Sequence, residues 1–256
     1  MHKINLIGFR TLYLKEVSRF LKVYNQTLLA PMVTSLLFLA IFKLAMGDNV
    51  QVMGSVPFER FMAAGLIMMA VVQQSFANTS SSLIMSKVIG TMIDYLLPPL
   101  SAAEITVAMA LAGVTRGVAV GVIVGLSISL FIHIEVQHIF FAVYYIIAAS
   151  LMLALLGMLG GIFSESFDQM AAITSYVITP LAFLSGTFYS VKQLPAFWYG
   201  VSHYNPFFYM IDGFRYSMTG YADGSLTTGM AVLGLMDLTL FIAVYWMLDK
   251  GYRIKT

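Results

Sequence analysis

The sequence has no cysteine, and only 10% of its 256 residues are charged. The absence of cysteine excludes a disulfide framework, a thiolate nucleophile and a cysteine-ligated metal site. The low charge excludes a compact soluble enzyme, since about 25% of the residues of a typical soluble domain are charged. The net charge of +2 is too small to indicate a nucleic-acid partner.

Common catalytic signatures are missing as well. The chain contains no phosphate-binding G-x-x-x-x-G-K-[ST] motif, no G-x-S-x-G and no H-E-x-x-H. It therefore has no known P-loop route to ATP hydrolysis, and we expect it to bind no cofactor itself. His133, Glu135 and His138 superficially offer metal ligands, but polar loop residues at a membrane surface explain them, and no metal site is predicted.

Apolar residues, by contrast, make up 59% of the chain, and the mean hydropathy is +0.85. A soluble protein of this length has too little interior to bury so many apolar side chains, so much of the chain faces lipid. A helix needs about 20 residues to cross a bilayer. Six stretches approach or exceed this length: 28–46, 61–77, 102–132, 139–163, 170–186 and 229–248. We expect an all-α polytopic membrane protein with a single transmembrane domain over residues 1–256.

Lysine and arginine are distributed unevenly between the two sides that six spans define. Five precede the first span, three follow the last, and Lys87 falls on the same side. The opposite loops carry Arg60, Lys192 and Arg215, and Lys43 lies near the end of its span. Because Lys and Arg are enriched in cytoplasmic loops, both termini are predicted to lie in the cytoplasm.

The segment before the first span has the pattern of an amphipathic helix. Over residues 3–24, apolar residues recur at three- and four-residue spacing, and Lys15, Arg19 and Lys22 lie on a different face. A basic amphipathic helix beside a span usually lies in the plane of the membrane interface. An ordinary solvated helix with a core stripe gives the same pattern.

Two segments between spans are too long to be simple turns. On the cytoplasmic side, the polar run from Asn78 to Ser82 is followed by a short amphipathic helix over 83–97, which Pro98 and Pro99 end. On the outer side, residues 190–218 contain two short apolar pieces. They indicate a pair of re-entrant helices or an aromatic belt.

The second outer piece has a clear helix start. Asn205 is a good N-cap, and Pro206 is a good first helical residue. Asp212 and Arg215 stand three residues apart on this helix, a spacing that allows an ion pair.

Four polar residues inside the predicted spans could line a path. A charge near the bilayer centre costs about 2.5–3.5 kcal/mol, so Arg116 and Asp237 should face protein or water. We hypothesise that they pair or line a shared polar cavity. Alternatively, the third span begins deeper in the cytoplasm and Arg116 reaches the interface. Gln73 and Gln74, at the inner end of the second span, are either interfacial or line a pathway.

Small residues indicate close helix packing. Gly113, Gly117, Gly121 and Gly125 recur every four residues and make one smooth helix face. Gly157, Gly160 and Gly161 in the fourth span offer a possible partner surface for it.

The most specific motifs of the chain are TPLAFLSGTFYSVKQLPAFW (179–198) and SHYNPFFYMIDGFRY (202–216). RFLKVYNQTLLAPMV (19–33) and GTMIDYLLPPLS (90–101) accompany them. With the order of the predicted elements, these segments resemble the permease subunit of ABC-2 type exporters, and most closely its YadH-like branch, over essentially the whole chain.

The resemblance implies a homodimer of six-span permeases in the bacterial cytoplasmic membrane, among membrane lipids. Two separate ABC ATPase subunits, which bind ATP and Mg²⁺, would dock below it, and the first and fifth spans would line the dimer interface. Residues 83–97 look like the coupling helix that sits in a cleft of the ATPase. Its matching positions here are Gly90, Thr91, Asp94 and Leu97, followed by Pro98.

Other functions stay open at this stage. An ion-coupled secondary transporter would also use intramembrane charge, although such proteins usually contain paired repeats and none is visible here. A non-transporting membrane scaffold fits the composition too. Among exporter substrates, polysaccharide, lipid and drug all remain possible.

Overall fold

The computed structural model describes residues 5–46, 51–52 and 56–253. Lys3 and Lys255, which contribute to the predicted orientation, lie outside these ranges. In chain order the elements are α1 (Leu6–Lys22), η1 (Asn25–Leu29), α2 (Ala30–Met46), β1 (Gln51–Val52), β2 (Val56–Pro57), α3 (Phe58–Ile89), α4 (Ile93–Leu96), α5 (Ala102–Ser129), α6 (Ile139–Phe163), α7 (Phe167–Ile173), η2 (Thr174–Ile178), α8 (Thr179–Leu184), η3 (Val191–Gln193), α9 (Ala196–Ser202), α10 (Pro206–Thr219) and α11 (Leu226–Lys250).

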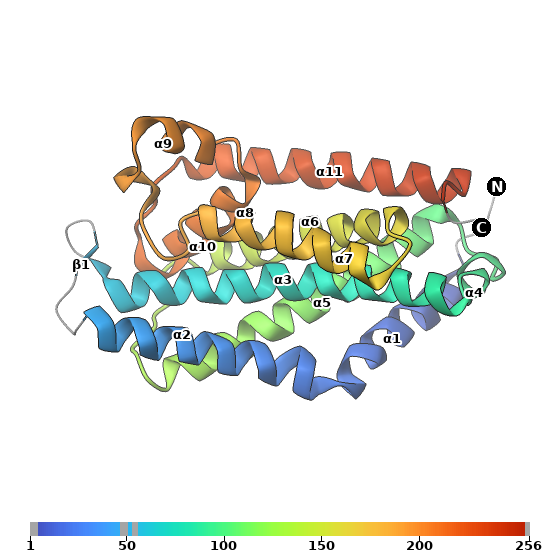
Figure 1. Cartoon of the computed structure of the whole chain (residues 1–256), viewed down its shortest axis with the longest axis horizontal. Helices are drawn as coiled ribbons and strands as arrows, with labels where there is room; N and C mark the ends of the chain where they lie inside the picture. The colour runs from blue at the N-terminus through green and yellow to red at the C-terminus, as the bar shows by residue number, and fades with distance from the viewer. Residues whose placement is uncertain (1–4, 47–50, 53–55, 254–256) are drawn as a thin grey trace.

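Six helical runs of the described chain are long and apolar enough to cross a membrane, which confirms the predicted all-α polytopic class. They run along the long axis of the molecule (Figure 1). α6 has the predicted bounds, and four other runs end within three residues of prediction. Only α3 departs further, because it continues to Ile89 where the second span was expected to end at residue 77.

The continuation of α3 takes the polar run from Asn78 to Ser82 into the protein interior. Four of these five residues are buried, and Thr79 Oγ1 donates a hydrogen bond to the backbone oxygen of Ala154 on α6 (2.6 Å). The predicted loop was wrong because these short polar side chains bond to neighbouring helices or to their own helix. α3 consequently lies at the centre of the bundle, packed against α5, α6 and α10.

The central helices approach closely at glycines. Gly117 of α5 lies against the hydroxyls of Ser75 and Ser150, and a Cβ at this position would collide with both. Gly157 of α6 lies against the backbone oxygen of Phe76 on α3. The smooth face predicted on α5 therefore packs against α3 and α6 together. Gly157 was expected to face α5, but it faces α3 instead.

The first and fifth spans each contain a π-helical segment shortly before a proline. η1 ends two residues before Pro31, and η2 ends two residues before Pro180. Proline has no N–H for the bond to the preceding turn, and its ring clashes with the carbonyl there. A wider π turn relieves this clash, so each helical run continues through its proline. Pro31 thus lies inside the span and not in its first turn, since the run begins at Asn25.

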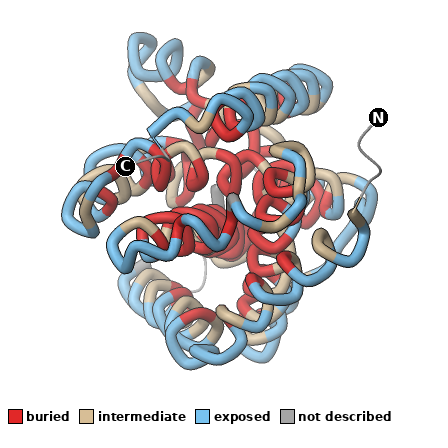
Figure 2. The backbone as a smooth tube through the Cα atoms, turned by 90° about the vertical axis from the view of Figure 1, so that its right-hand side faces the viewer, coloured by how far each residue is buried: buried red, intermediate tan, exposed pale blue. Residues whose placement is uncertain are grey.

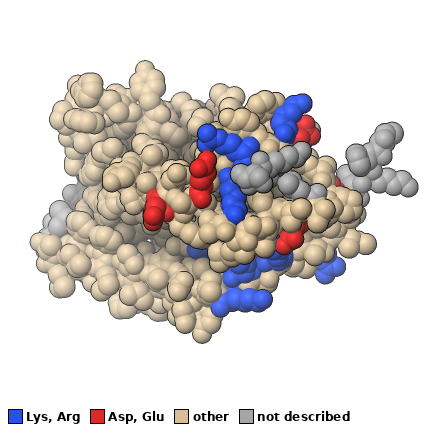
Figure 3. Space-filling model, turned by 45° about the vertical axis from the view of Figure 1, so that its right-hand side comes forward, with Lys and Arg blue, Asp and Glu red and all other residues tan. Residues whose placement is uncertain are grey.

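The bundle has two different ends. The start of α1, the end of α11 and α4 lie at one, which we call the α4 end; β1, β2, α9 and α10 lie at the other, the α9 end (Figure 1). The lysines and arginines visible in Figure 3 gather toward the α4 end. Viewed along the bundle, buried residues lie inside and exposed ones outside (Figure 2). The least buried spans are η1–α2 and α7–α8, with 17% of their most apolar stretch buried.

Candidate functional site

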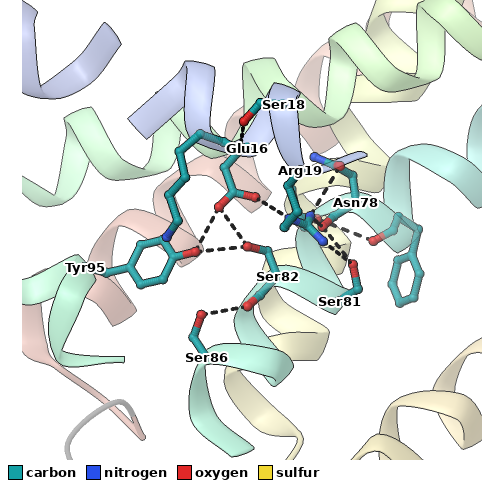
Figure 4. Close-up of polar contacts among 11 residues, drawn as sticks. Glu16, Ser18, Arg19, Asn78, Ser81, Ser82, Ser86 and Tyr95 are labelled. Carbon is teal, nitrogen blue, oxygen red and sulfur yellow. Dashed lines mark hydrogen bonds and ion pairs between the residues drawn. The ribbon is translucent and has the colours of Figure 1, made fainter. Parts of the chain in front are cut away.

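A buried carboxylate joins three elements at the α4 end. Glu16, on α1, is 1% exposed. Its Oε1 accepts hydrogen bonds from the hydroxyls of Tyr95 (2.8 Å) and Ser82 (2.9 Å), and its Oε2 accepts one from Arg19 Nε (3.2 Å). Tyr95 belongs to α4 and Ser82 to α3, so Glu16 connects α1 to both (Figure 4). We call Glu16, Arg19, Ser82 and Tyr95 the junction cluster.

Arg19 extends the junction cluster along α3. Its Nη1 donates to Ser81 Oγ (3.1 Å), and its Nη2 donates to the backbone oxygen of Asn78 (Figure 4). On the other side, Lys15 Nζ lies 4.0 Å from the centre of the Tyr95 ring, a cation–π contact. Because buried charges persist only when they are paired and hydrogen-bonded, these contacts account for the burial of Glu16.

The segment after α3 differs from the single helix predicted over 83–97. Residues 83–89 belong to α3, which ends with Gly90 in the left-handed conformation (φ 79°), and α4 is a single turn from Ile93 to Leu96. Glycine adopts this conformation without strain, so it ends the helix and reverses the chain. The amphipathic pattern on both sides of Gly90 had hidden this break.

The α4 segment presents one side to the exterior and one to the bundle. The exposed residues include four that were predicted to contact a partner: Gly90, Thr91, Asp94 and Leu97. Met92 and Tyr95 are buried beneath them, and Pro98 is half-buried. The segment therefore offers a hydroxyl, a carboxylate and apolar groups on a base that the junction cluster fixes.

A lysine attaches this base to a fourth element. Lys87 Nζ, near the end of α3, donates to the backbone oxygens of Ile162 and Ser164 (3.2 Å to Ser164), where α6 ends. The last carbonyls of a helix lack partners within it, and a lysine there satisfies them. Lys87 thus joins the end of α3, just before the α4 segment, to the end of α6.

Arg116 lies inside the bundle, near the midpoint of α5, and is 7% exposed. Its Nη2 donates to Oε1 of Gln74 on α3, and its buried Nε has no hydrogen-bond partner among the described residues. This position agrees with the bundle-interior interpretation and disagrees with the one in which Arg116 reaches the interface.

The hypothesised pair of Arg116 and Asp237 does not form. Among the described residues no ion pair involves either of them, because Arg116 is directed toward α3. Asp237 lies near the midpoint of α11, and in the described part of the chain its buried Oδ1 has no hydrogen-bond partner.

Gln73 and Gln74 line a cavity of about 180 Å³ between the first and second spans. Its other polar groups come from Gln26, Thr34 and Ser35. The two glutamines stand at the midpoint of α3 and not at the inner end of a span, as predicted, because α3 is longer than expected.

At the α9 end, α10 begins as predicted. Asn205 Oδ1 accepts a hydrogen bond from the N–H of Phe207 (3.1 Å), and Pro206 is the first helical residue. Asp212 and Arg215 approach only to 3.9 Å. Both side chains make shorter hydrogen bonds to backbone groups, so the ion pair between them is the weaker interaction.

Asp212 and Arg215 instead fasten the outer loops. Asp212 accepts hydrogen bonds from the backbone N–H groups of Asp223 (2.7 Å) and Gly224 (2.8 Å). Arg215 is fully buried, donates to the backbone oxygen of Gly186 and lies 3.7 Å from the centre of the Phe61 ring.

Asp223 forms a second buried connection there. Its carboxylate accepts hydrogen bonds from the hydroxyls of Ser190 and Tyr221 (2.7 Å each) and from the N–H of Val191 (2.9 Å). Burial, and the hydrogen bond to this carboxylate, raise the pKa of Tyr221, so its hydroxyl stays protonated as a donor. The loop before α9 is thereby bonded to the loop before α11.

The sequence interpretation missed Glu16, Tyr95 and Asp223 as polar anchors. A signal was present for Glu16, which is the only acidic residue of α1. It stands midway between Leu12 and Phe20, four residues from each, and all three are buried. An acid in the apolar register of an amphipathic helix needs a partner elsewhere in the fold.

The described residues contain no group of three or more potential metal ligands. His133 Nε2 and Glu135 Oε1 lie 2.6 Å apart on an exposed loop at the α9 end, and this hydrogen bond lowers the pKa of Glu135. The pair belongs to the surface and gives no reason to propose a metal.

Comparison with known proteins identifies the family. The model of a family described as ABC-2 type transporter matches residues 8–219. The chain belongs to this family. The inner membrane transport permease YadH of Escherichia coli (strain K12) is 31% identical over 250 residues, or 98% of each chain. The permease of the same name from Shigella flexneri matches equally.

The family and the relatives confirm the resemblance drawn from the outer motifs and from the segment at 90–101. This ABC-2 protein is a membrane subunit of a transporter. With its six apolar helical runs, it is a multi-pass protein of the bacterial inner membrane.

Proposed function

We propose that this ABC-2 permease forms, as a homodimer, the translocation path of an exporter that a separate ABC ATPase drives. The observation that carries this proposal is the attachment of the exposed α4 segment to α1 and α3 through the buried junction cluster, with Lys87 joining α3 in turn to the end of α6. A docking element must be firmly connected to the spans that it moves. ATP and Mg²⁺ are bound by the ATPase subunit.

The exposed side of the α4 segment supplies the docking surface. Thr91 and Asp94 provide a donor and a negative charge, and Leu97, 72% exposed, provides apolar area. A cleft on the ATPase with a basic rim would complement Asp94. Aromatic and apolar anchors with a polar rim are the usual make-up of such interfaces.

Force from the ATPase reaches the spans by two routes. The first runs from Tyr95 through Glu16 into α1, which leads directly to η1 and α2. The second runs into α3, an unbroken helix of 32 residues and about 48 Å. We expect the permease dimer to have two conformations that differ in the position of the α4 segments. ATP binding shifts the population between them because the closed ATPase pair binds one conformation more tightly than the other.

The two least buried spans support the proposed dimer. Figure 1 shows η1–α2 and α7–α8 on either side of α3. At the α9 end a phenylalanine cluster connects them, since the ring of Phe188, just after α8, lies 5.7 Å from Phe38 and 5.2 Å from Phe42 on α2. A second copy placed against this face would cover exposed apolar side chains of both spans. It would also put the cavity at Gln73 beside the dimer seam.

The charge distribution supports an orientation with the α4 end in the cytoplasm. Lysine and arginine gather toward this end (Figure 3), and the positive-inside rule assigns such an end to the cytoplasm. The α4 segment then faces the compartment that contains ATP.

Purification of the tagged full chain from membranes of its own host tests the proposal. We expect an ABC ATPase subunit to co-purify and to hydrolyse ATP, and Asp94→Lys to reduce its recovery at least tenfold. Glu135→Lys is the matched control, because it reverses an exposed acid at the α9 end and should leave recovery unchanged. If Asp94→Lys retains the ATPase, docking at α4 is wrong. If the unmodified chain recovers none, the whole proposal fails.

A further inference from the structure

The cavity between η1–α2 and α3 combines polar walls with a nearby uncompensated charge. Polar groups inside a membrane-crossing region are costly unless they have partners or line a pathway. In the described part of the chain, no hydrogen bond engages the side chains of Gln26, Gln73, Thr34 or Ser35. Four polar side chains therefore face this space with their hydrogen-bonding capacity unused.

The charge behind the wall is Arg116. Its guanidinium is hydrogen-bonded to Gln74, which itself lines the cavity, and no group of the described chain bonds to its Nε. No carboxylate among the described residues pairs with it. In a medium of low dielectric constant, a cation without a counter-ion attracts an anion strongly.

We propose that this cavity binds the anionic, oxygen-rich head of an amphiphile, with Arg116 supplying the positive potential and Gln73 and Gln74 the hydrogen bonds. The inference rests on the transport function proposed above and specifies its substrate class. A cavity of about 180 Å³ has roughly the volume of six waters, which suits a phosphate-sized head but not a whole amphiphile. The apolar tail would remain outside, toward lipid or the dimer seam.

Apolar ligands fit the cavity less well. The larger apolar groove of the chain, with a volume of about 800 Å³, is lined by Leu36, Leu37, Leu44 and Phe131, on a different face of α2. An uncharged apolar molecule would prefer that groove. The cavity at Gln73 offers amides and hydroxyls and lies one hydrogen bond from a cation.

The test measures binding of radiolabelled dodecyl phosphate to the full chain in phosphatidylcholine nanodiscs. Arg116→Gln should weaken binding at least tenfold, or about 1.4 kcal/mol. Gln73→Leu should weaken it several-fold while keeping the bond between Arg116 and Gln74, and Arg116→Lys should retain most of it. Lys43→Gln, which removes a cation beside the apolar groove, is the matched control and should bind normally.

Three results would overturn the inference. One is unchanged binding in both Arg116→Gln and Gln73→Leu, with each variant monodisperse and melting like the parent. Another is equal competition by dodecyltrimethylammonium, a cationic amphiphile of the same length. The third is a change of oligomeric state in Arg116→Gln with normal probe binding, since the cavity would then be part of a packing seam.

A further arm distinguishes two sources of the same chemistry. Phosphatidylglycerol is added to the nanodiscs. Displacement of the probe by this lipid, dependent on Arg116, supports a membrane phospholipid as the natural ligand. Continued binding of the probe supports a separate anionic amphiphile. The binding assay needs no ATPase, so its failure beside normal ATPase recovery overturns the substrate class alone.

Discussion

Glu16 accepts hydrogen bonds from two hydroxyls and a guanidinium while almost fully enclosed. Glu16→Gln removes the charge that strengthens these bonds and places an amide N–H near groups that already donate. We expect a loss of about 1–3 kcal/mol, the cost of an unsatisfied buried group. Because Tyr95 would lose its anchor, hydrogen exchange of the backbone amides of residues 91–97 should become faster.

Ser86→Ala provides the comparison for that exchange experiment. Within the described part of the chain, Ser86 Oγ bonds only to its own helix, at the backbone oxygen of Ser82 (2.8 Å), and connects no second element. Its removal should leave exchange at α4 unchanged. Equal exchange in Glu16→Gln and the parent would contradict a structural role for the junction cluster.

At the α9 end, substitution of Asp223 should have an effect like that of Glu16→Gln. Asp223→Asn keeps the shape but replaces an acceptor oxygen with a donor, opposite groups that already donate. We expect a loss of about 1–3 kcal/mol and faster proteolysis of the loop between Gly186 and Leu194. Asp168→Asn, at an exposed position of α7, should change neither quantity. Identical proteolysis of the two variants would show that Asp223 does not hold the loop.

Among the helices, the contact of α3 with α6 depends on the absence of a side chain at Gly157. Gly157→Ala would place a methyl group against the backbone oxygen of Phe76, which a helix cannot move easily. Overpacking of this kind costs about 1–3 kcal/mol. A lower melting temperature of the purified chain in nanodiscs is the expected result.

Gly125→Ala is the matched control for that substitution. Its nearest neighbour would be a side-chain carbon of Ile67 at 3.6 Å, an ordinary contact. Alanine in mid-helix should then raise stability by about 0.5–1 kcal/mol. The opposite signs of the two effects separate packing from helix propensity, and a stabilising Gly157→Ala would refute the close contact.

The bounds of a helix could be predicted from the sequence where an uninterrupted apolar stretch sets both of its ends. α6 is apolar from end to end, and its bounds follow directly. The course of α3 past residue 77 did not follow, because Asn78 to Ser82 are polar and become buried only when α1 and α6 provide partners. The break at Gly90 was missed for a related reason, since apolar spacing continues on both sides of it.

For the whole molecule, the lack of cysteine allows the orientation to be measured with single introduced cysteines. Asp94 and Glu135 are both exposed and lie at opposite ends of the bundle. In spheroplasts, Glu135→Cys should react with a membrane-impermeant maleimide, and Asp94→Cys should react only after permeabilisation. Labelling of Asp94→Cys in intact spheroplasts would reverse the orientation.

The candidate sites were predictable to different degrees. Thr91, Asp94 and Leu97 were singled out by the resemblance to the ABC-2 family, and the start of α10 at Pro206 followed from capping chemistry. The partner of Arg116 did not follow, since helix rotation about its axis decides between α3 and α11. Such rotations depend on long-range packing that periodicity does not specify.

The central place of α3 has a consequence for biosynthesis. The polar second half of α3 is covered largely by α6. The ribosome completes α3 roughly 70 residues before it completes α6, or about 4–15 s earlier at usual rates of synthesis. During this interval Thr79 lacks its hydrogen-bond partner on α6, the backbone oxygen of Ala154. The nascent second span must therefore be held by the insertion machinery, or kept near the membrane surface, until the fourth span arrives.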